Sequence, residues 1–365
     1  MARCSVCFKE SAFVSSALGV CGPCLMQGKQ AERVEALRAS VRRGFELPER
    51  IPREAGEAAC GNCSNRCSPA EGESGFCGVW QRAGGAVVPR FDFRREALFS
   101  FYHDPLPTNC VADWVCPGGT GAGYPEYAVR DGPERGFFNL AVFFEACNFD
   151  CLFCQNWHFR KQARRGRPVP LERLVGAVNE RTTCICYFGG DPTVQMEAAL
   201  HASEAALRAA AGRVLRICWE TNGGAAAPLL DRAFELSLRT GGCVKFDLKA
   251  WNESLHRALT GTSAEPTRRN FARLAKRFEE RPEPPPLVAS TLLVPGYITA
   301  EEVREIAGFI AELDPRIPYA LLAFAPQYCM DDLPPTPRAF AQEALKAARE
   351  SGLTRVRLGN QHLLW

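Results

Sequence analysis

Three cysteines near the middle of the chain have a spacing that could perform chemistry. They stand in the run Cys147-Asn148-Phe149-Asp150-Cys151-Leu152-Phe153-Cys154, a C-x3-C-x2-C pattern directly after the apolar segment 137–145. Three thiolates can hold three irons of a [4Fe-4S] cube and leave the fourth iron open to another ligand. The alternatives are a structural zinc loop or three unrelated core cysteines, but structural zinc normally takes four protein ligands. We therefore predict a cluster with one open iron.

A first cysteine quartet lies at the start of the chain. Two C-x2-C pairs are separated by 13 residues and comprise Cys4, Cys7, Cys21 and Cys24. This ligand pattern is typical of a zinc ribbon or a rubredoxin-like iron site, and a tetrathiolate tetrahedron accepts either metal. Since a module of this size has little core of its own, we expect the metal to supply much of its folding free energy.

A second quartet follows with the spacing C-x2-C-x3-C-x9-C, at Cys60, Cys63, Cys67 and Cys77. The turn-forming segment 69–75 would let the chain reverse and return the last cysteine to the first three. We favour a mononuclear zinc or iron site here, with a further iron-sulfur cluster as the alternative. The spacing differs from the two-cluster ferredoxin run C-x2-C-x2-C-x3-C-P.

The elements that must position the three central cysteines alternate between strand-like and helix-like patterns, which predicts parallel βα units of an α/β fold. The apolar strand-like runs are 139–144, 184–188, 215–219, 244–248, 287–294 and 319–324, with a short seventh at 356–358. The helical periods are 171–181, 196–211, 228–239, 267–280, 299–313 and 337–351. In such folds functional residues gather at the carboxyl ends of the strands.

Polar motifs follow three of these strands. Gly189-Gly190-Asp191-Pro192 comes after the second strand, where glycines allow close backbone approach to a ligand. The third strand ends with Glu220 and Asn222 in the sequence ETNG, and the fourth delivers Asp247 and Lys249 to one face. GGDP alone is only a turn, and Asp247 with Lys249 could be an ordinary salt bridge at the rim.

Together these motifs resemble the radical S-adenosylmethionine (SAM) superfamily. Six segments are similar to the branch of pyruvate formate-lyase activating enzyme and the AmmeMemoRadiSam proteins. They are residues 60–79, GGDP (near the family's GGEP), ETNG, DLK, SLHRALTG (254–261) and LLVPGYI (292–298). The resemblance covers roughly residues 60–365 and implies an open (β/α)6 partial TIM barrel behind N-terminal cysteine-rich modules. The missing ferredoxin-like run makes a simple activase assignment doubtful.

The resemblance also implies roles for individual residues. Cys147, Cys151 and Cys154 would be the cluster ligands, and Phe153 would pack near the SAM adenine. Asp191 or a nearby carbonyl, within the Gly189, Gly190 and Pro192 turn, would bind the SAM ammonium. Glu220 and Asn222 would reach the ribose, and Asp247 with Lys249 would lie near the carboxylate.

The implied reaction is reductive cleavage of SAM to a 5′-deoxyadenosyl radical, which takes hydrogen from a carbon of a protein substrate entering the barrel. We favour C-methylation, of the kind that modifies methyl-coenzyme M reductase, with cobalamin as an optional cofactor, although the chain has no D-x-H-x-x-G cobalamin motif. The alternatives are a glycyl radical activase, a small-molecule radical SAM enzyme and an inactive metal-binding adaptor. A flavodoxin- or ferredoxin-like protein would donate the electron.

Composition limits the remaining possibilities. The 365 residues carry a net charge of +3, which gives no argument for nucleic acid, and no apolar run is long enough for a membrane span. Without a signal peptide we expect a cytoplasmic protein whose cysteines bind metals. The expected domains are residues 1–55, 56–136 and the barrel 137–365.

Other segments yield weaker expectations. We interpret 33–43 as the solvated face of a helix and 102–127 as a Gly- and Pro-rich connecting loop at the barrel mouth or against the metal modules. Cys110 and Cys116 in that loop are packed thiols or metal ligands. Cys329 is a candidate hydrogen-atom donor. The strand-associated cysteines are interpreted as small buried side chains, namely Cys184, Cys186, Cys218 and Cys243.

Overall fold

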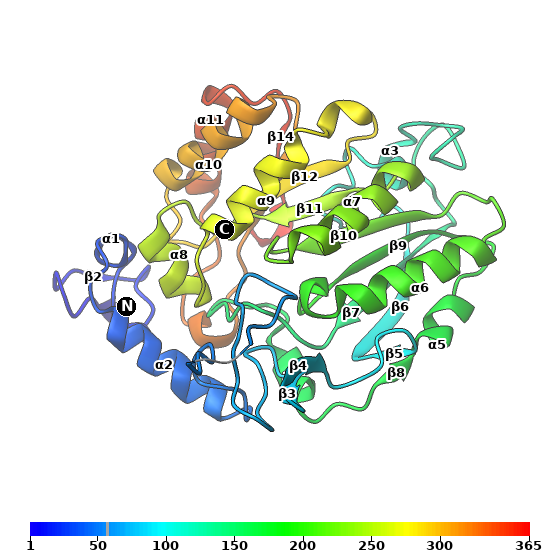
Figure 1. Ribbon diagram of the computed structural model, residues 1–365. Helices are drawn as coiled ribbons and strands as arrows, with labels where there is room; N and C mark the ends of the chain where they lie inside the picture. Colours follow the sequence, from blue (N-terminus) through cyan, green and yellow to red (C-terminus); the bar gives the residue numbers. More distant parts are fainter. Residues whose placement is uncertain (56–57) are drawn as a thin grey trace.

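A computed structural model describes residues 1–55 and 58–365. Residue 56, where we predicted the second module to begin, lies outside the described residues. The chain forms a mixed α/β structure in which one large sheet carries a layer of helices (Figure 1).

The central sheet contains eight strands in the order β14-β13-β12-β11-β10-β9-β7-β6. Their bounds are β6 Phe99–Pro105, β7 Phe138–Phe144, β9 Thr182–Gly189, β10 Arg216–Thr221, β11 Val244–Asp247, β12 Leu287–Leu293, β13 Tyr319–Ala323 and β14 Val356–Gly359. The seven strands from β7 onward are parallel, as predicted, while β6 pairs antiparallel with β7. Because β6 and β14 are edges, the sheet is an open partial barrel.

Strand β6 is the element of the sheet that the sequence did not predict. Its second half, from Tyr102, falls in the segment that we interpreted as a connecting loop. The mixed apolar and polar sequence of this strand suits an edge of the sheet that is partly exposed to solvent.

Helices cover one face of the sheet (Figure 1). They are α5 Leu171–Gly176, α6 Met196–Ala209, α7 Ala227–Thr240, α9 Glu265–Ala275, α10 Ala300–Leu313 and α11 Arg338–Glu350. Helix α5 is shorter than predicted because Asn179 accepts from the Arg181 amide and starts a turn. An additional helix, α8 Glu253–Thr260, lies between β11 and α9.

The two faces of the strands carry different side chains. On the helix side Tyr187 stacks on Trp219, with ring centroids 4.7 Å apart, and Trp219 Nε1 donates to a carbonyl of α7 at 3.0 Å. Side chains alternate along a strand, so Cys186 and Cys218 point to the opposite, inner face. The aromatic face therefore anchors the helices and leaves the inner face for the site.

The N-terminal region is built from short elements around the barrel. These are β1 Ala2–Arg3, β2 Glu10–Ser11, α1 Gly22–Met26, α2 Ala31–Arg43, β3 Trp80–Ala83, β4 Ala86–Pro89, β5 Glu96–Ala97 and α3 Pro117–Thr120. Two further elements follow β7, α4 Arg160–Ala163 and β8 Val169–Pro170. Helices α1 and α2 pack against α8.

The prediction that residues 33–43 form a solvated helix face is wrong in part. Helix α2 is present, but its Arg38 and Arg42 are 5% and 2% exposed. They are buried because a carboxylate of the barrel pairs with them, as described below.

Within the described ranges, the chain has no helix long and apolar enough to cross a membrane.

Candidate active site

A cavity opens on the inner face of the sheet, at the carboxyl ends of the strands. Its volume is about 990 Å³ including its opening to solvent, within the usual range for small-molecule sites. The structure brings eleven of the twelve predicted cluster and cofactor residues to its wall. They are Cys147, Cys151, Phe153, Cys154, Gly189, Gly190, Asp191, Glu220, Asn222, Asp247 and Lys249.

Pro192 is the one that does not line the cavity among the residues described. It is buried at the start of the short 3-10 turn Pro192–Gln195, where its fixed φ suits the first position. The roles of all twelve residues in binding stay predictions.

The loop that carries the three cysteines, residues 145–156, is hereafter the cluster loop. Gly189 and Gly190 allow it to lie against the end of β9. A Cβ on Gly190 would stand 2.2 Å from the Ala146 carbonyl, and Gly189 has φ +97°. The Gly190 amide instead donates to the Phe144 carbonyl at 2.8 Å. Both glycines are thus required for the approach of the two strand ends.

Asp191 is a buried carboxylate held by neutral donors. It accepts hydrogen bonds from the Thr193 amide at 2.8 Å, the Thr221 hydroxyl at 3.0 Å and the Asn222 amide at 2.6 Å. Burial raises its pKa, and these donors offset only part of that rise. A cation that reached Asp191 would relieve the cost of burying its charge.

Asn222 connects the end of β10 to the cluster loop. Its side-chain amide donates to Asn148 Oδ1 at 2.8 Å and lies 3.7 Å from Cys147 Sγ. Hydrogen bonds to ligand sulfurs tune a cluster, so Asn222 is placed to act on the cysteine as well as toward the cavity.

Asp247 and Lys249 form an ion pair with each other. Lys249 Nζ also lies 5.7 Å from the centroid of the Phe153 ring. Burial lowers the pKa of Lys249, but Asp247 and Cys151 outweigh burial and raise it overall. Asp247 Oδ1 is buried and, in the described part of the chain, has no hydrogen-bond partner, so the cavity wall retains a free acceptor beside a fixed cation.

Glu220 has a protein partner that the sequence did not reveal. Lys245 on β11 places Nζ 2.9 Å from Glu220 Oε1. We had expected ligand hydroxyls to satisfy this carboxylate. Because Glu220 and Lys245 are paired across neighbouring strands, the floor of the cavity is already neutralised.

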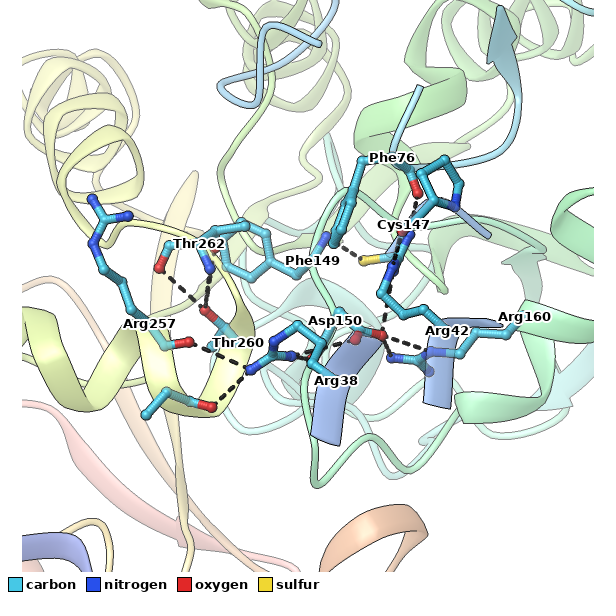
Figure 2. Close-up of polar contacts among 12 residues, drawn as sticks. Arg38, Arg42, Phe76, Cys147, Phe149, Asp150, Arg160, Arg257, Thr260 and Thr262 are labelled. Atoms are coloured by element: carbon cyan, nitrogen blue, oxygen red, sulfur yellow. Dashed lines mark hydrogen bonds and ion pairs between the residues drawn. The ribbon is translucent and has the colours of Figure 1, made fainter. Parts of the chain in front are cut away.

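Asp150, inside the cysteine motif, is surrounded by three arginines (Figure 2). Arg160 donates to Oδ1 at 2.6 and 2.9 Å, Arg38 lies 3.3 Å from Oδ2 and Arg42 lies 3.5 Å from Oδ1. Burial would raise the pKa of Asp150, but the three guanidinium groups, Arg160 foremost, hold it below its ordinary value. Three cations thus face one anion beside the cluster loop, and an anionic cluster would balance the excess.

Helix α8 and its following turn hold the same loop by its backbone. The Asp150 amide donates to the Thr260 carbonyl and the Leu152 amide to the Leu259 carbonyl, both at 2.9 Å. Arg38 also donates to the Ala258 carbonyl at 2.7 Å. The segment 254–261 therefore fixes the cluster loop.

The first cysteine quartet converges. The sulfurs of Cys4, Cys7, Cys21 and Cys24 all lie within 4.8 Å of one another, and three of these residues are buried. Such spacing suits four thiolates on one tetrahedral ion. Tyr297 attaches this module to the barrel, since its hydroxyl accepts from the Ser15 amide and donates to the Val20 carbonyl, both at 3.0 Å.

That attachment divides the segment 292–298 between two surroundings. Leu292 lines the cavity, but Tyr297 is fully buried under the N-terminal module. Cys329, the candidate hydrogen donor, is half-buried and lies outside the described cavity lining. Its amide donates to the Leu152 carbonyl at 3.0 Å, so its backbone supports the cluster loop.

The second quartet is buried but more widely spaced. Cys60, Cys63, Cys67 and Cys77 are at most 8% exposed, yet among the described residues they do not meet the 4.8 Å spacing of the first quartet. The module lies against the site, because Asn65 donates to the Asn148 carbonyl at 2.6 Å and Ser64 to the Gly224 carbonyl at 2.8 Å. Metal binding at both quartets stays a prediction.

Several residues around the cavity were missed. They are Asp150 with its three arginines, Asn148, and Lys245. One signal was present: a charged residue inside an otherwise apolar motif must find a partner if buried. Arg160 is ten residues from Asp150, but Arg38 and Arg42 are more than 100 residues away along the chain, and local patterns do not identify such partners.

Comparison with known proteins identifies the domain that holds this cavity. Residues 141–310 match the model of the Radical SAM superfamily. The chain carries a radical SAM domain. The match begins within β7 and ends within α10, so it contains the cluster loop and every predicted cofactor residue.

Similar proteins span more of the chain. The uncharacterized protein MJ0808 of Methanocaldococcus jannaschii is 26% identical over 82% of this chain and 80% of its own length. A domain of pyruvate-formate lyase-activating enzyme from Bacteroides vulgatus is 17% identical, covering 48% of this chain and 98% of that chain with a TM-score of 0.37. Streptococcus suis SuiB is 13% identical, covering 60% and 48% with a TM-score of 0.43.

The residues of the radical SAM domain fit the cofactors that this superfamily implies, a [4Fe-4S] cluster and SAM. Three cysteines reach the cavity from one loop. Their sulfurs are not all within 4.8 Å of one another, as the sulfurs of the first quartet are, and this wider spacing is expected when each cysteine binds a different iron. Asp191, whose hydrogen-bond donors among the described residues are all neutral, and the free acceptor on Asp247 beside Lys249 suit an amino acid with both charges.

Proposed function

We propose that this protein is a radical SAM enzyme that removes hydrogen from a carbon of a protein substrate and so modifies it after translation. The observation that carries the proposal is the single cavity in which three cluster cysteines meet polar residues from three successive strands. The alternative of an inactive adaptor is less favoured because those side chains are all directed into one cavity of ligand size.

The side chains of the protein would bind the cluster and SAM and orient them. Cys147, Cys151 and Cys154 would hold the cluster, while Asp191 would bind the SAM ammonium and Lys249 its carboxylate. When bound, the cluster and SAM supply one-electron reductive cleavage and hydrogen abstraction, chemistry that belongs to the cofactors and not to the side chains.

Asp150 and its arginines act as positioning residues. They fix the cluster loop between α2 and α8, and their two excess positive charges favour the anionic state of the bound cluster. The cavity opens to solvent, and a substrate segment would enter through that opening. An external flavodoxin- or ferredoxin-like protein would provide the electron.

Within this class we favour C-methylation of the protein substrate, with cobalamin as an optional partner. The support is the sequence resemblance to protein-modifying members of the superfamily. Mass spectrometry of proteins from cells with and without this gene tests it: a 14 Da increase on one peptide supports methylation. A backbone cleavage at glycine under air would favour an activase, and unchanged peptides would overturn a protein substrate.

The proposal is tested with anaerobically purified protein, reconstituted with iron and sulfide, reduced with dithionite and mixed with SAM. We expect 5′-deoxyadenosine by liquid chromatography and mass spectrometry, and none from the Cys154→Ala variant. An intact cube that releases no 5′-deoxyadenosine would overturn the enzyme assignment.

A further inference from the structure

Six of the chain's 18 cysteines gather inside the barrel, directly below the cavity. We call them the cysteine layer: Cys110, Cys116, Cys184, Cys186, Cys218 and Cys243. The sequence interpretation of four of them as separate small core residues missed this convergence. Interior layers of βα barrels are normally filled by bulky branched side chains, so a layer of thiols is unusual.

Strand register produces the layer. Cys186 pairs with Cys218 on the neighbouring strand, and Cys218 stands beside Cys243 because the Trp219 amide donates to the Cys243 carbonyl at 3.0 Å. Three adjacent strands therefore present thiols at one level of the inner face. Cys184 lies one step lower, with its sulfur 3.6 Å from that of Cys218.

The connecting loop supplies the opposite wall. Cys110 and Cys116 come from the segment before and at the start of α3, and both line the same small cavity as the strand cysteines. A loop of this kind usually runs over the surface. Here the loop instead points two thiols into the barrel, toward the four thiols of the strands. A loop that only connected β6 to β7 could remain on the surface.

A buried cation points into the layer. Lys245 is 2% exposed, and its Nζ lies 3.1 Å from Cys186 Sγ and 3.2 Å from Cys110 Sγ, in addition to its bond with Glu220. Neutral thiols are weak acceptors, so in the part of the chain that the structure describes two of the three ammonium donors meet only weak partners. Sulfurs that carry negative charge would satisfy them.

We propose that the cysteine layer binds an additional iron-sulfur cluster inside the barrel. Six thiols exceed the four that one tetrahedral ion accepts, and no three of them, among the residues described, meet the 4.8 Å spacing of the first quartet. Thiolates spread over three strands and a loop suit a polynuclear centre. Transfer of a preformed cluster exchanges its carrier thiolates for the thiols of the layer. Each thiol of the layer passes its proton to a departing thiolate, so no oxidation state changes. Lys245 is the counter-charge.

The test separates this cluster from the one at the cluster loop. The variant Cys147→Ala/Cys151→Ala/Cys154→Ala serves as background, and Cys186→Ser/Cys218→Ser/Cys243→Ser is added to it. We expect the background to retain acid-labile sulfide and visible absorbance, and the added substitutions to lower sulfide at least about two-fold. The second quartet is present in both variants, so the difference reports the cysteine layer. Cys329→Ser in the same background should leave sulfide unchanged.

Equal sulfide and iron in the two variants would overturn the proposal, as would metal without sulfide, which indicates a single ion. Circular dichroism and retention of metal at the first quartet check that the variants fold. If the variants do not fold, electron paramagnetic resonance of the reduced wild-type protein and of two single variants decides. A signal that SAM does not affect, that is lost in Lys245→Met and kept in Cys60→Ser, supports a cluster in the cysteine layer. Retention of that signal in Lys245→Met contradicts it. This test does not depend on 5′-deoxyadenosine formation.

Discussion

The two sides of the cluster loop each contain a buried aspartate, but the surroundings differ. Asp150 is fully buried against Arg38, Arg42 and Arg160. Asp191 is 4% exposed and, within residues 1–55 and 58–365, accepts only from neutral donors. The arginines hold the pKa of Asp150 below its ordinary value, while burial raises that of Asp191. The charge of Asp150 is balanced by arginines that hold the fold together, whereas the charge of Asp191 has no cationic partner in the described part of the chain.

This difference assigns different tasks to two residues that look alike in the sequence. The Asp150 side connects α2, α8 and the cluster loop. Among the described residues Asp150 itself does not line the cavity, although its partner Arg160 does. The Asp191 side forms the cavity wall. A change on the first side should therefore affect stability, and a change on the second should affect ligand binding.

The largest expected effect comes from Asp150→Asn. Removing the carboxylate leaves three buried guanidinium groups without their counter-charge, which should lower the free energy of unfolding by about 3–5 kcal/mol. Anaerobic urea unfolding followed by circular dichroism measures it. The matched variant Asp191→Asn, which leaves no cation unpaired, should lose about 1 kcal/mol. Equal losses in the two variants would contradict the distinction.

The next effect concerns His256 of α8, which supports the Asp150 side. Its Nδ1 lies 2.9 Å from the Thr262 carbonyl, its ring meets Phe149 edge-on, and burial lowers its pKa from 6.5 to about 4. Above pH 6.5 both folded and unfolded chains are neutral at this residue. As pH falls toward 4 only the unfolded chain gains the proton, so stability decreases by roughly 3 kcal/mol over this window.

The variant His256→Asn, whose amide can replace the Nδ1 donor, should remove that part of the pH dependence. Unfolding free energies at pH 7 and pH 4.5 for the wild type and the variant provide the comparison. If the wild type loses no more stability on acidification than the variant, His256 is not buried in its neutral form.

A smaller effect is expected from Asp191→Asn on ligand affinity. Without the carboxylate the SAM ammonium loses a charged partner, and the dissociation constant should rise about ten-fold, equivalent to roughly 1.4 kcal/mol. Anaerobic equilibrium dialysis with labelled SAM measures it, and cluster absorbance confirms that the cofactor is retained. An unchanged constant would show that nearby carbonyls bind the ammonium instead.

The sequence predicted most of the fold because parallel strands buried by helices produce strong apolar runs. All seven parallel strands were identified, together with the three motifs that meet in the cavity. Edge strand β6 was missed, since a strand with one solvent face lacks such a run.

Long-range partners account for the other differences. Arg38 and Arg42 look like solvated helix residues until α2 is placed against Asp150, and Glu220 looks unpaired until β11 brings Lys245 beside it. The cysteine layer arises in the same way from strand register and a distant loop. Spacing along the chain cannot report contacts that tertiary structure alone creates.

In the proposed function the Asp191 side of the cluster loop would present SAM to the open iron of a cluster held by Cys147, Cys151 and Cys154. Electron paramagnetic resonance of the reduced cluster during a SAM titration tests it most directly. We expect the wild-type spectrum to change on SAM addition, and the Asp191→Asn spectrum to start the same and need about ten-fold more SAM for the same change. A wild-type spectrum that does not respond to SAM would contradict the account.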